Sequence, residues 1–333
     1  MGRSPRIEFE GAVYHVMSRG NRRELVFRDD KDCVTFVDAL DEVCGRCGWR
    51  VHAFVLMGNH YHMLLETPEA NLVDGMRWLQ GTYTKRFNIR HKQSGHLFQG
   101  RYKALLVDSD GDYFRIVSDY IHLNPARAKC VDLKEKTLAD YRWSSFPLFL
   151  HPSRRPSWLC VERSLGCLDL RDDRPGLVRY RQYMQKRVLE IAGSEKPWEM
   201  DRQWNNIRRG WCFGSDEFRE KMTGMLDGAL DGKRRDSFCG EEVAAHDAFA
   251  AERLLNSGLK KLGVSRSDLS GLPKGDPRKK ALALLIRRKT SVRNEWISGS
   301  LVMGSPARLS AYVKETADAT EGELVQLKKM LKC

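Results

Sequence analysis

Two histidines separated by one residue are the first feature of this sequence whose type and spacing could do chemistry. His60 and His62 lie in the segment Gly58–Glu66, which follows a run of β-branched and apolar residues at 51–57. If that segment is a strand, residues i and i+2 leave the same face about 7 Å apart along it. The two imidazoles would then point together and could share one metal ion. An incidental pair, with one ring half-buried and one solvated, is the alternative interpretation.

A tyrosine and an asparagine share one face of a helix predicted over residues 112–123. Tyr120 and Asn124 are four residues apart, so their side chains are neighbours on that face. Asn124 precedes Pro125, and a proline disfavours helical geometry at the residue before it, which predicts that the helix ends there. A core tyrosine packed on a sheet and an asparagine that only terminates the helix are the alternatives.

The elements that must position these residues alternate between strands and helices. Gly58 and Asn59 form a two-residue junction between two strands, which is a strong hairpin signal. Before the hairpin, a helix begins near Asp30, with Asp29 or Asp30 as its N-cap, and its apolar residues recur at i, i+3 and i+4. The predicted order β-α-β-β-α-β is that of an antiparallel, ferredoxin-like α+β domain. The predicted strands are 13–18, 51–57, 60–66 and 103–108, with helices at 30–44 and 72–87.

Basic and aromatic residues cluster in two loops of the same region. Three arginines follow the first strand in a glycine-containing turn, and arginine on a loop suits phosphate contacts. The loop 95–102 interleaves aromatic rings with cations, which suits single-stranded nucleic acid, because bases stack on the rings while cations follow the phosphates. A solvated loop in the first case and rings that plug the core in the second are the alternatives. The predicted DNA contacts in this half are Arg19, Arg22, Arg23, Phe98, Arg101, Tyr102 and Lys103.

The composition agrees with a nucleic-acid partner. The 333 residues have a net charge of +13, which favours a polyanion, first a nucleic acid and second an anionic membrane surface. No apolar run reaches the roughly 18 residues of a membrane span, and the first residues form no apolar signal segment. Of nine scattered cysteines, only Cys44 and Cys47 are closely spaced, and no second pair completes a zinc site. We therefore expect a cytoplasmic, nucleoid-associated protein without membrane contact.

The second half of the chain has the pattern of a helical region. A proline- and arginine-containing stretch at 151–156 predicts a linker, and a second break follows at 271–277. These breaks predict three domains, covering residues 1–150, 151–270 and 271–333. Helices are expected at 177–192, 216–230, 241–259, 278–289, 291–302 and 307–314.

The last two of these helices flank a short turn that contains Gly304. Two helices joined in this way, the second carrying basic residues, are consistent with helix-turn-helix DNA binding. Arg308 and Ser310 are then candidate groove-facing residues. A helical bundle that only braces the first domain is the alternative.

Together, these motifs resemble those of a known family. His60-Tyr61-His62 on a strand, followed by Asp119-Tyr120-Ile121-His122-Leu123-Asn124-Pro125 after the fourth strand, resembles the single-tyrosine HUH transposases. The resemblance is closer to the REP-associated tyrosine transposases, relatives of insertion-sequence transposases. The segments 14–23, 95–102 and 141–145 match that group as well. The similarity covers roughly residues 5–150, and the last segment resembles the C-terminal region of longer members.

The resemblance implies a site-specific enzyme that cuts and rejoins DNA through a 5′-phosphotyrosine. Its substrate would be single-stranded or hairpin DNA, such as repetitive extragenic palindromes. His60 and His62 match the two histidine ligands of a divalent metal, Mg²⁺ or Mn²⁺. Asn124 matches the third ligand and Tyr120 the nucleophile. A monomer is expected, and a dimer with exchanged tyrosines is the alternative.

Two other functions are open on the sequence. The first is a DNA-binding regulator that keeps the fold but does not cut. The second is a metal-dependent phosphodiesterase that uses activated water, with His15, His52 or Glu66 completing its site. Glu66 and Asp119 are also alternatives to Asn124 as the third metal ligand, because both lie close to the proposed ligands in sequence.

Overall fold

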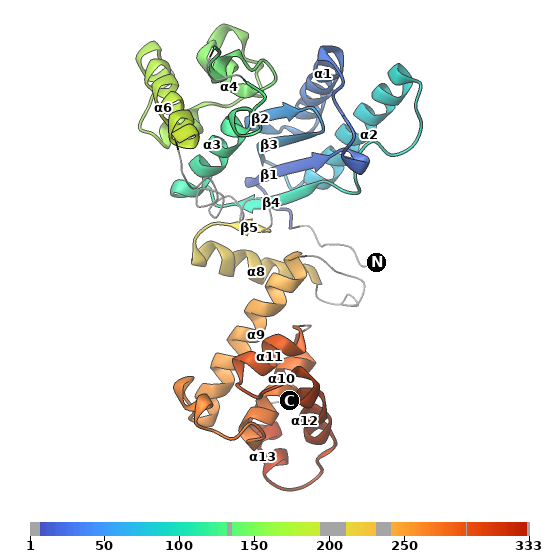
Figure 1. Ribbon diagram of the computed structural model, residues 1–333, viewed down its shortest axis with the longest axis vertical. Helices are drawn as coiled ribbons and strands as arrows, with labels where there is room; N and C mark the ends of the chain where they lie inside the picture. The colour runs from blue at the N-terminus through green and yellow to red at the C-terminus, as the bar shows by residue number, and fades with distance from the viewer. Residues whose placement is uncertain (1–6, 132–134, 194–210, 231–240, 291, 332–333) are drawn as a thin grey trace. The chain divides into compact units, whose positions relative to one another are not determined.

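The chain consists of two compact units in the computed structural model, which describes residues 7–131, 135–193, 211–230, 241–290 and 292–331. The units comprise residues 6–225 and 226–333 (Figure 1). Each unit has its own hydrophobic core. The predicted boundaries at 150 and 270 do not coincide with this division. Residues 151–193 pack in the first unit, and the helix that precedes residue 270 packs in the second.

A twisted sheet forms the centre of the first unit. Its strands follow the order β2-β3-β1-β4-β5, and the pairs β2–β3, β3–β1 and β1–β4 are antiparallel. This is the predicted ferredoxin-like arrangement, and the α+β prediction is confirmed. The short β5, which the sequence did not predict, extends the sheet parallel to β4. The bounds are β1 Ala12–Arg19, β2 Arg50–Met57, β3 His60–Thr67, β4 Lys103–Val107 and β5 Cys212–Phe213.

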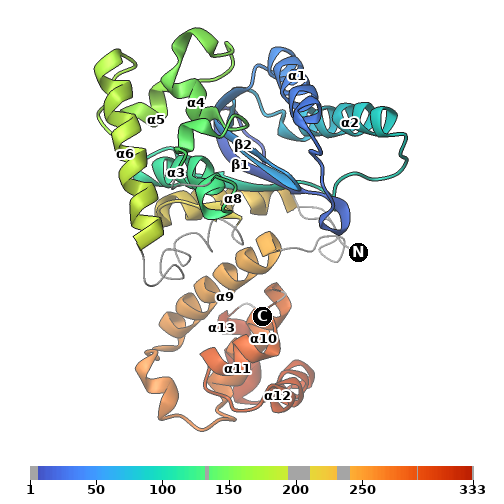
Figure 2. The same cartoon turned by 45° about the horizontal axis from the view of Figure 1, so that its top comes forward.

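Helices cover both faces of the sheet (Figure 2). On one face, α1 (Asp30–Cys47) packs against α2 (Leu72–His91). The carboxylate of Asp29 accepts hydrogen bonds from the backbone nitrogens of Lys31 and Asp32, so Asp29 is the N-cap of α1. On the other face, α3 (Asp112–Arg127) lies against β2 and β3.

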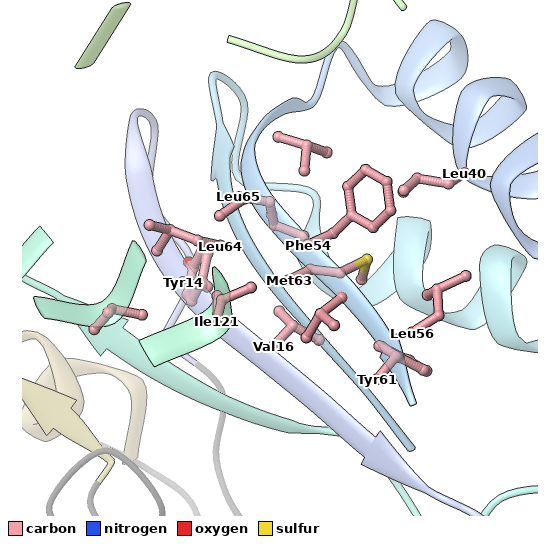
Figure 3. Packing of buried hydrophobic residues seen from close by; sticks show 14 of the residues in the cluster. Tyr14, Val16, Leu40, Phe54, Leu56, Tyr61, Met63, Leu64, Leu65 and Ile121 are labelled. Carbon is pink, nitrogen blue, oxygen red and sulfur yellow. The ribbon is translucent and has the colours of Figure 1, made fainter. Parts of the chain in front are cut away.

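The alternation of β3 decides which of its side chains meet which helices. Tyr61 and Met63 belong to the core on the side of α1, where the ring of Phe36 lies 4.8 Å from that of Tyr61. His60 and His62 therefore point to the opposite face, the side of α3. Figure 3 shows Leu64, a residue in phase with these histidines, near Ile121 of α3.

The helix α3 does not end at Asn124, in contrast to the prediction. It continues through Pro125 to Arg127. A proline removes one backbone donor from a helix, but near the end of a helix this costs only a single intrahelical bond. The backbone nitrogen of Ala128 still donates to the carbonyl of Asn124, which closes the last turn.

Further helices pack on α3 in the first unit. His122, on the buried side of α3, has Nδ1 2.8 Å from the hydroxyl of Tyr180 and Nε2 2.7 Å from that of Ser145. The predicted linker at 151–156 is not free: its Arg155 is bonded to Asp172 and to two backbone carbonyls. The helices are α4 Ser145–Leu150, α5 Glu162–Gly166, α6 Arg174–Gly193 and α8 Asp216–Leu230, with short 3-10 turns at Asn21–Arg23, Leu138–Asp140 and Pro152–Arg154.

The second unit is helical in its described residues, as predicted. The helix predicted at 291–302 is shorter than expected, because Val302 has a φ of 52°, which ends regular helical geometry. No helix in the described ranges is long and apolar enough to cross a membrane. The helices are α9 Glu241–Leu262, α10 Pro277–Lys289, α11 Asn294–Ser300, α12 Pro306–Asp318 and α13 Glu323–Leu331, with a 3-10 turn at Ser267–Ser270.

Candidate active site

A pocket of about 610 Å³ opens on the α3 side of the sheet. It brings together the four residues singled out for cleavage chemistry, namely His60, His62, Tyr120 and Asn124. Strand β3 supplies both histidines, and helix α3 supplies Tyr120 and Asn124. The remaining lining residues are Met17, Ser18, Arg19, Gln99, Arg101, Lys103, Arg127 and Ala128.

The two histidines share one face of β3, as their spacing predicted. Their ring centroids are 5.1 Å apart and the rings are perpendicular, at 88°. Nδ1 of His60 lies 2.7 Å from Oδ1 of Asn59. Because an amide oxygen only accepts, Nδ1 must bear the proton, and the lone pair of His60 is therefore on Nε2.

A third histidine, His15, supports His62 from the neighbouring strand. The two rings stack with centroids 5.1 Å apart, and Nε2 of His15 lies 3.0 Å from Nδ1 of His62. The β1–β3 register, which pairs Met17 with His62, brings the rings together. The sequence suggested His15 only as a residue that could complete the site of a phosphodiesterase that uses activated water. Strand alternation places His15, Met17 and Arg19 on the same face of β1. This pattern is visible in the sequence, but only the register of β1 against β3 shows that His15 meets His62.

Tyr120 lies against this histidine pair. Its ring centroid is 5.5 Å from that of His62 and 5.7 Å from that of His15, in edge-on geometry. The ring is 3% exposed, and the guanidinium carbon of Arg127 lies 5.2 Å from its centroid. Asn124, one helical turn further on, is also buried, and its Nδ2 has no hydrogen-bond partner. Because an amide nitrogen only donates, an acceptor such as a phosphate oxygen of a bound ligand would satisfy it, whereas a cation would not.

Burial keeps the imidazoles of His60 and His15 uncharged. It lowers the pKa of His60 to about 4, with help from Arg19, and lowers the pKa of His15 to about 3, with help from Lys103. Both are therefore neutral near pH 7, which is the form that binds a metal. The positive charge of the pocket comes instead from Arg19, Arg101, Lys103 and Arg127. This arrangement suits an anionic phosphodiester.

The donor atoms of the pocket fit a divalent cation. Two imidazole nitrogens and one amide oxygen make a mixed set that suits Mn²⁺ better than Mg²⁺, which prefers oxygen ligands. Within the described residues, no three His, Cys, Asp or Glu side chains are grouped to hold a metal.

The two carboxylates considered as third ligands are engaged elsewhere. Glu66 lies 3.3 Å from His52 Nε2 and 3.3 Å from Arg163 Nη1. Asp119 accepts a hydrogen bond from Tyr183 and lies 3.6 Å from Arg115. Neither residue lines the pocket.

The predicted DNA contacts divide into four groups. Arg19, Arg101 and Lys103 line the pocket, whereas Arg22 and Arg23 are exposed on the 3-10 turn Asn21–Arg23, outside its lining. Phe98 and Tyr102 are buried, at 6% and 7% exposure. The Phe98 ring packs against two core tyrosines, so for these rings the structure favours core packing over base stacking. Arg308 belongs to the second unit.

Comparisons with known proteins found similarity over part of this chain. Residues 8–124 match the family model described as "Transposase IS200 like". A solved REP-associated tyrosine transposase bound to a REP hairpin is 18% identical, over 48% of this chain and 92% of that one, with a TM-score of 0.40. A putative transposase from Deinococcus radiodurans R1 is 22% identical, over 32% and 85% of the two chains, with a TM-score of 0.25. No curated protein matches.

Proposed function

We propose that this chain, whose residues 8–124 match the IS200-like transposase family, cuts and rejoins single-stranded DNA with Tyr120 as the nucleophile. One observation carries the proposal: Tyr120, His60, His62 and Asn124, from separate parts of the sequence, line one basic pocket. The substrate class that the motif resemblance implies is DNA that folds into hairpins, such as repetitive extragenic palindromes.

The pocket residues have distinct roles in this proposal. His60 and His62, through Nε2, and Asn124, through Oδ1, would hold a divalent ion. That ion, when bound, would supply stabilisation of the charge that develops on the scissile phosphate. Arg19 and Lys103 would bind the flanking phosphates and fix the strand across the pocket.

The covalent step conserves the energy of the phosphodiester. The phenol oxygen of Tyr120 attacks phosphorus in line, so an O–P bond to the tyrosine forms while the bond to the 3′ oxygen breaks. The phenol loses a proton and the departing 3′ oxygen gains one, which leaves a 5′-phosphotyrosine and a 3′-hydroxyl. That hydroxyl, or one from another end, reverses the step and rejoins the DNA without water or a nucleotide cofactor.

Tyr120 lies beside histidines of its own chain, 5.5 Å from the His62 ring, which supports a monomer that cleaves in cis. Mixing Tyr120→Phe with His62→Ala tests this point. We expect no adduct from the mixture, because neither chain has a complete site. Recovery of the adduct would indicate exchanged tyrosines in a dimer.

The decisive experiment traps the covalent intermediate. The full chain is incubated with Mn²⁺ and single-stranded hairpin oligonucleotides labelled at either end, and adducts are separated under denaturing conditions. We expect a tyrosine-linked 5′ end in the wild type and none in Tyr120→Phe. Tyr113→Phe is the matched control, because it removes the same hydroxyl from the same helix outside the pocket.

The outcomes separate the proposed function from its rivals. A regulator leaves the DNA whole in every variant. A phosphodiesterase that uses water releases free ends, and it would still do so in Tyr120→Phe. The phosphodiesterase alternative required His15, His52 or Glu66 to complete its site. Two of these residues, His52 and Glu66, are hydrogen-bonded to each other and do not line the pocket.

A further inference from the structure

The carboxy-terminal unit contains three consecutive helices that pack on one another. The helix α10 contacts both α11 and α12, and α11 contacts α12. Ile297 of α11, Leu301 of the turn and Leu309 of α12 are each fully buried in their common core. The order of a supporting helix, a short helix, a turn and a longer helix is that of a helix-turn-helix.

The turn between α11 and α12 is held in one conformation. Val302 and Gly304 both have positive φ, of 52° and 89°. Lys279 of α10 is buried, and its ammonium group donates to the carbonyl oxygens of Val302 and Leu272, at 3.2 Å and 3.0 Å. A buried lysine that binds two carbonyls ties the turn to α10. The orientation of α12 relative to α11 is therefore set by specific contacts.

The outer face of α12 has small side chains near the start of the helix. Leu309 and Thr316 point into the core, so the opposite face contains Ala307, Ala311, Lys314 and, in the last turn, Asp318, all exposed. Two alanines at successive turns let a surface approach the helix backbone closely. The described side chains of this face include no aromatic ring on which a single-stranded base could stack.

The charges around this face are complementary to DNA. Lys280 of α10 pairs with Glu315, at 2.7 Å, which offsets the acidic group on the flank of α12. Arg308 and Lys314 are exposed cations on the same helix. From residue 271 to the end, the sequence has thirteen Lys and Arg against six Asp and Glu, so this segment supplies more than half of the net +13.

We propose that α10, α11 and α12 form a helix-turn-helix that binds double-stranded DNA with the outer face of α12 in the major groove. The major groove accepts an α-helix, and the first residues of a recognition helix contact the bases. Arg308 and Lys314 bind the backbone or base edges. Ser310, a groove candidate from the sequence, instead accepts a hydrogen bond from Asn294 at 3.1 Å and positions α12. This duplex site is independent of cleavage in the pocket.

The test measures binding of the full chain to a pool of random-sequence 30-base-pair duplexes by fluorescence anisotropy between about 50 and 200 mM salt. Ala311→Glu places a bulky negative charge on the outer face. Lys329→Gln, the matched control, makes the same change in net charge at an exposed position on α13. We expect duplex affinity to fall about tenfold or more in Ala311→Glu and by less than about twofold in the control.

A second variant makes the test independent of any folding defect in the first. The double variant Arg308→Ala, Lys314→Ala should reduce the slope of log affinity against log salt by about two, about one for each lost phosphate contact. Wild-type affinity and slope in both variants would overturn the proposal. Adduct formation on a single-stranded hairpin should be unchanged in both, so a failure of the duplex site is distinguishable from a failure of the cleavage site.

Discussion

Nε2 of His15 lies 3.0 Å from Nδ1 of His62, and the two rings stack inside the pocket wall. One of these nitrogens must donate and the other accept. If Nδ1 of His62 donates, Nε2 of His62 has the lone pair that a cation needs. If Nε2 of His15 donates, Nε2 of His62 bears a proton and has no lone pair for a cation. We predict that His15 accepts from His62 and acts as a positioning residue for the proposed metal site by fixing the tautomer of His62.

His15→Phe tests this relationship, since it keeps a stacked ring but removes the accepting nitrogen. We expect the Mn²⁺ concentration needed for half-maximal adduct formation to rise about 10- to 100-fold, with recovery at high Mn²⁺. His52→Phe is the matched control: it makes the same change at a buried histidine outside the pocket and should leave the Mn²⁺ titration unchanged. Coincident titrations of His15→Phe and wild type would rule out the positioning role.

Asn124 offers a way to separate metal binding from folding. Its Nδ2 is buried without a hydrogen-bond partner, so Asn124→Leu, of similar volume, should change the free energy of unfolding by less than about 1 kcal/mol. The same variant loses an oxygen ligand, and we expect a loss of metal-dependent adduct formation. Asn124→Asp, which keeps an oxygen donor, should retain activity. An active Asn124→Leu would show that the asparagine is not a ligand.

Glu66 should behave as a structural carboxylate. The hydrogen bond from His52, with Arg163 and Arg50 nearby, lowers the pKa of Glu66 below its usual 4.5. A carboxyl group with a lowered folded-state pKa stabilises the fold above about pH 4.5, and this stabilisation is lost as the pH falls through the folded-state pKa. Glu66→Gln should therefore lower the free energy of unfolding at pH 7, and the difference from wild type should shrink on acidification.

Chemical denaturation at pH 3 to 7 measures this difference. Glu69→Gln, an exposed neighbour on the loop after β3, is the control and should match the wild type. Adduct formation by Glu66→Gln at neutral pH should persist with an unchanged metal requirement. A changed requirement would return Glu66 to the list of candidate ligands.

The hydroxyl of Tyr180 joins α6 to the helix that holds Tyr120, through a 2.8 Å hydrogen bond to the buried His122. Tyr180→Phe leaves that imidazole nitrogen unpaired and should destabilise the protein by about 1–3 kcal/mol. The melting temperature should fall by about 2–4 °C per kcal/mol. Tyr113→Phe, which removes a half-exposed hydroxyl at the start of α3, is the control. Equal melting temperatures for Tyr180→Phe and wild type would contradict a structural role for α6.

The local pattern of the sequence determined most strands and helices of this protein and aligned the candidate residues, whose catalytic roles came from the family resemblance. Strand alternation put His60 and His62 on one face, the Gly58–Asn59 pair closed a hairpin, and helical spacing aligned Tyr120 with Asn124. These are short-range properties, because backbone periodicity and turn chemistry act within a few residues.

Only the tertiary structure decided which distant residues meet. The pairing of His15 with His62 depends on the register of β1 against β3, and the bond from Tyr180 to His122 depends on α6 packing over α3. The inward rotation of Phe98 and the extension of α3 past Pro125 likewise follow from burial against neighbouring elements. Contacts of this kind join residues far apart in the chain. They therefore produce no periodic pattern in the local sequence from which they could be predicted.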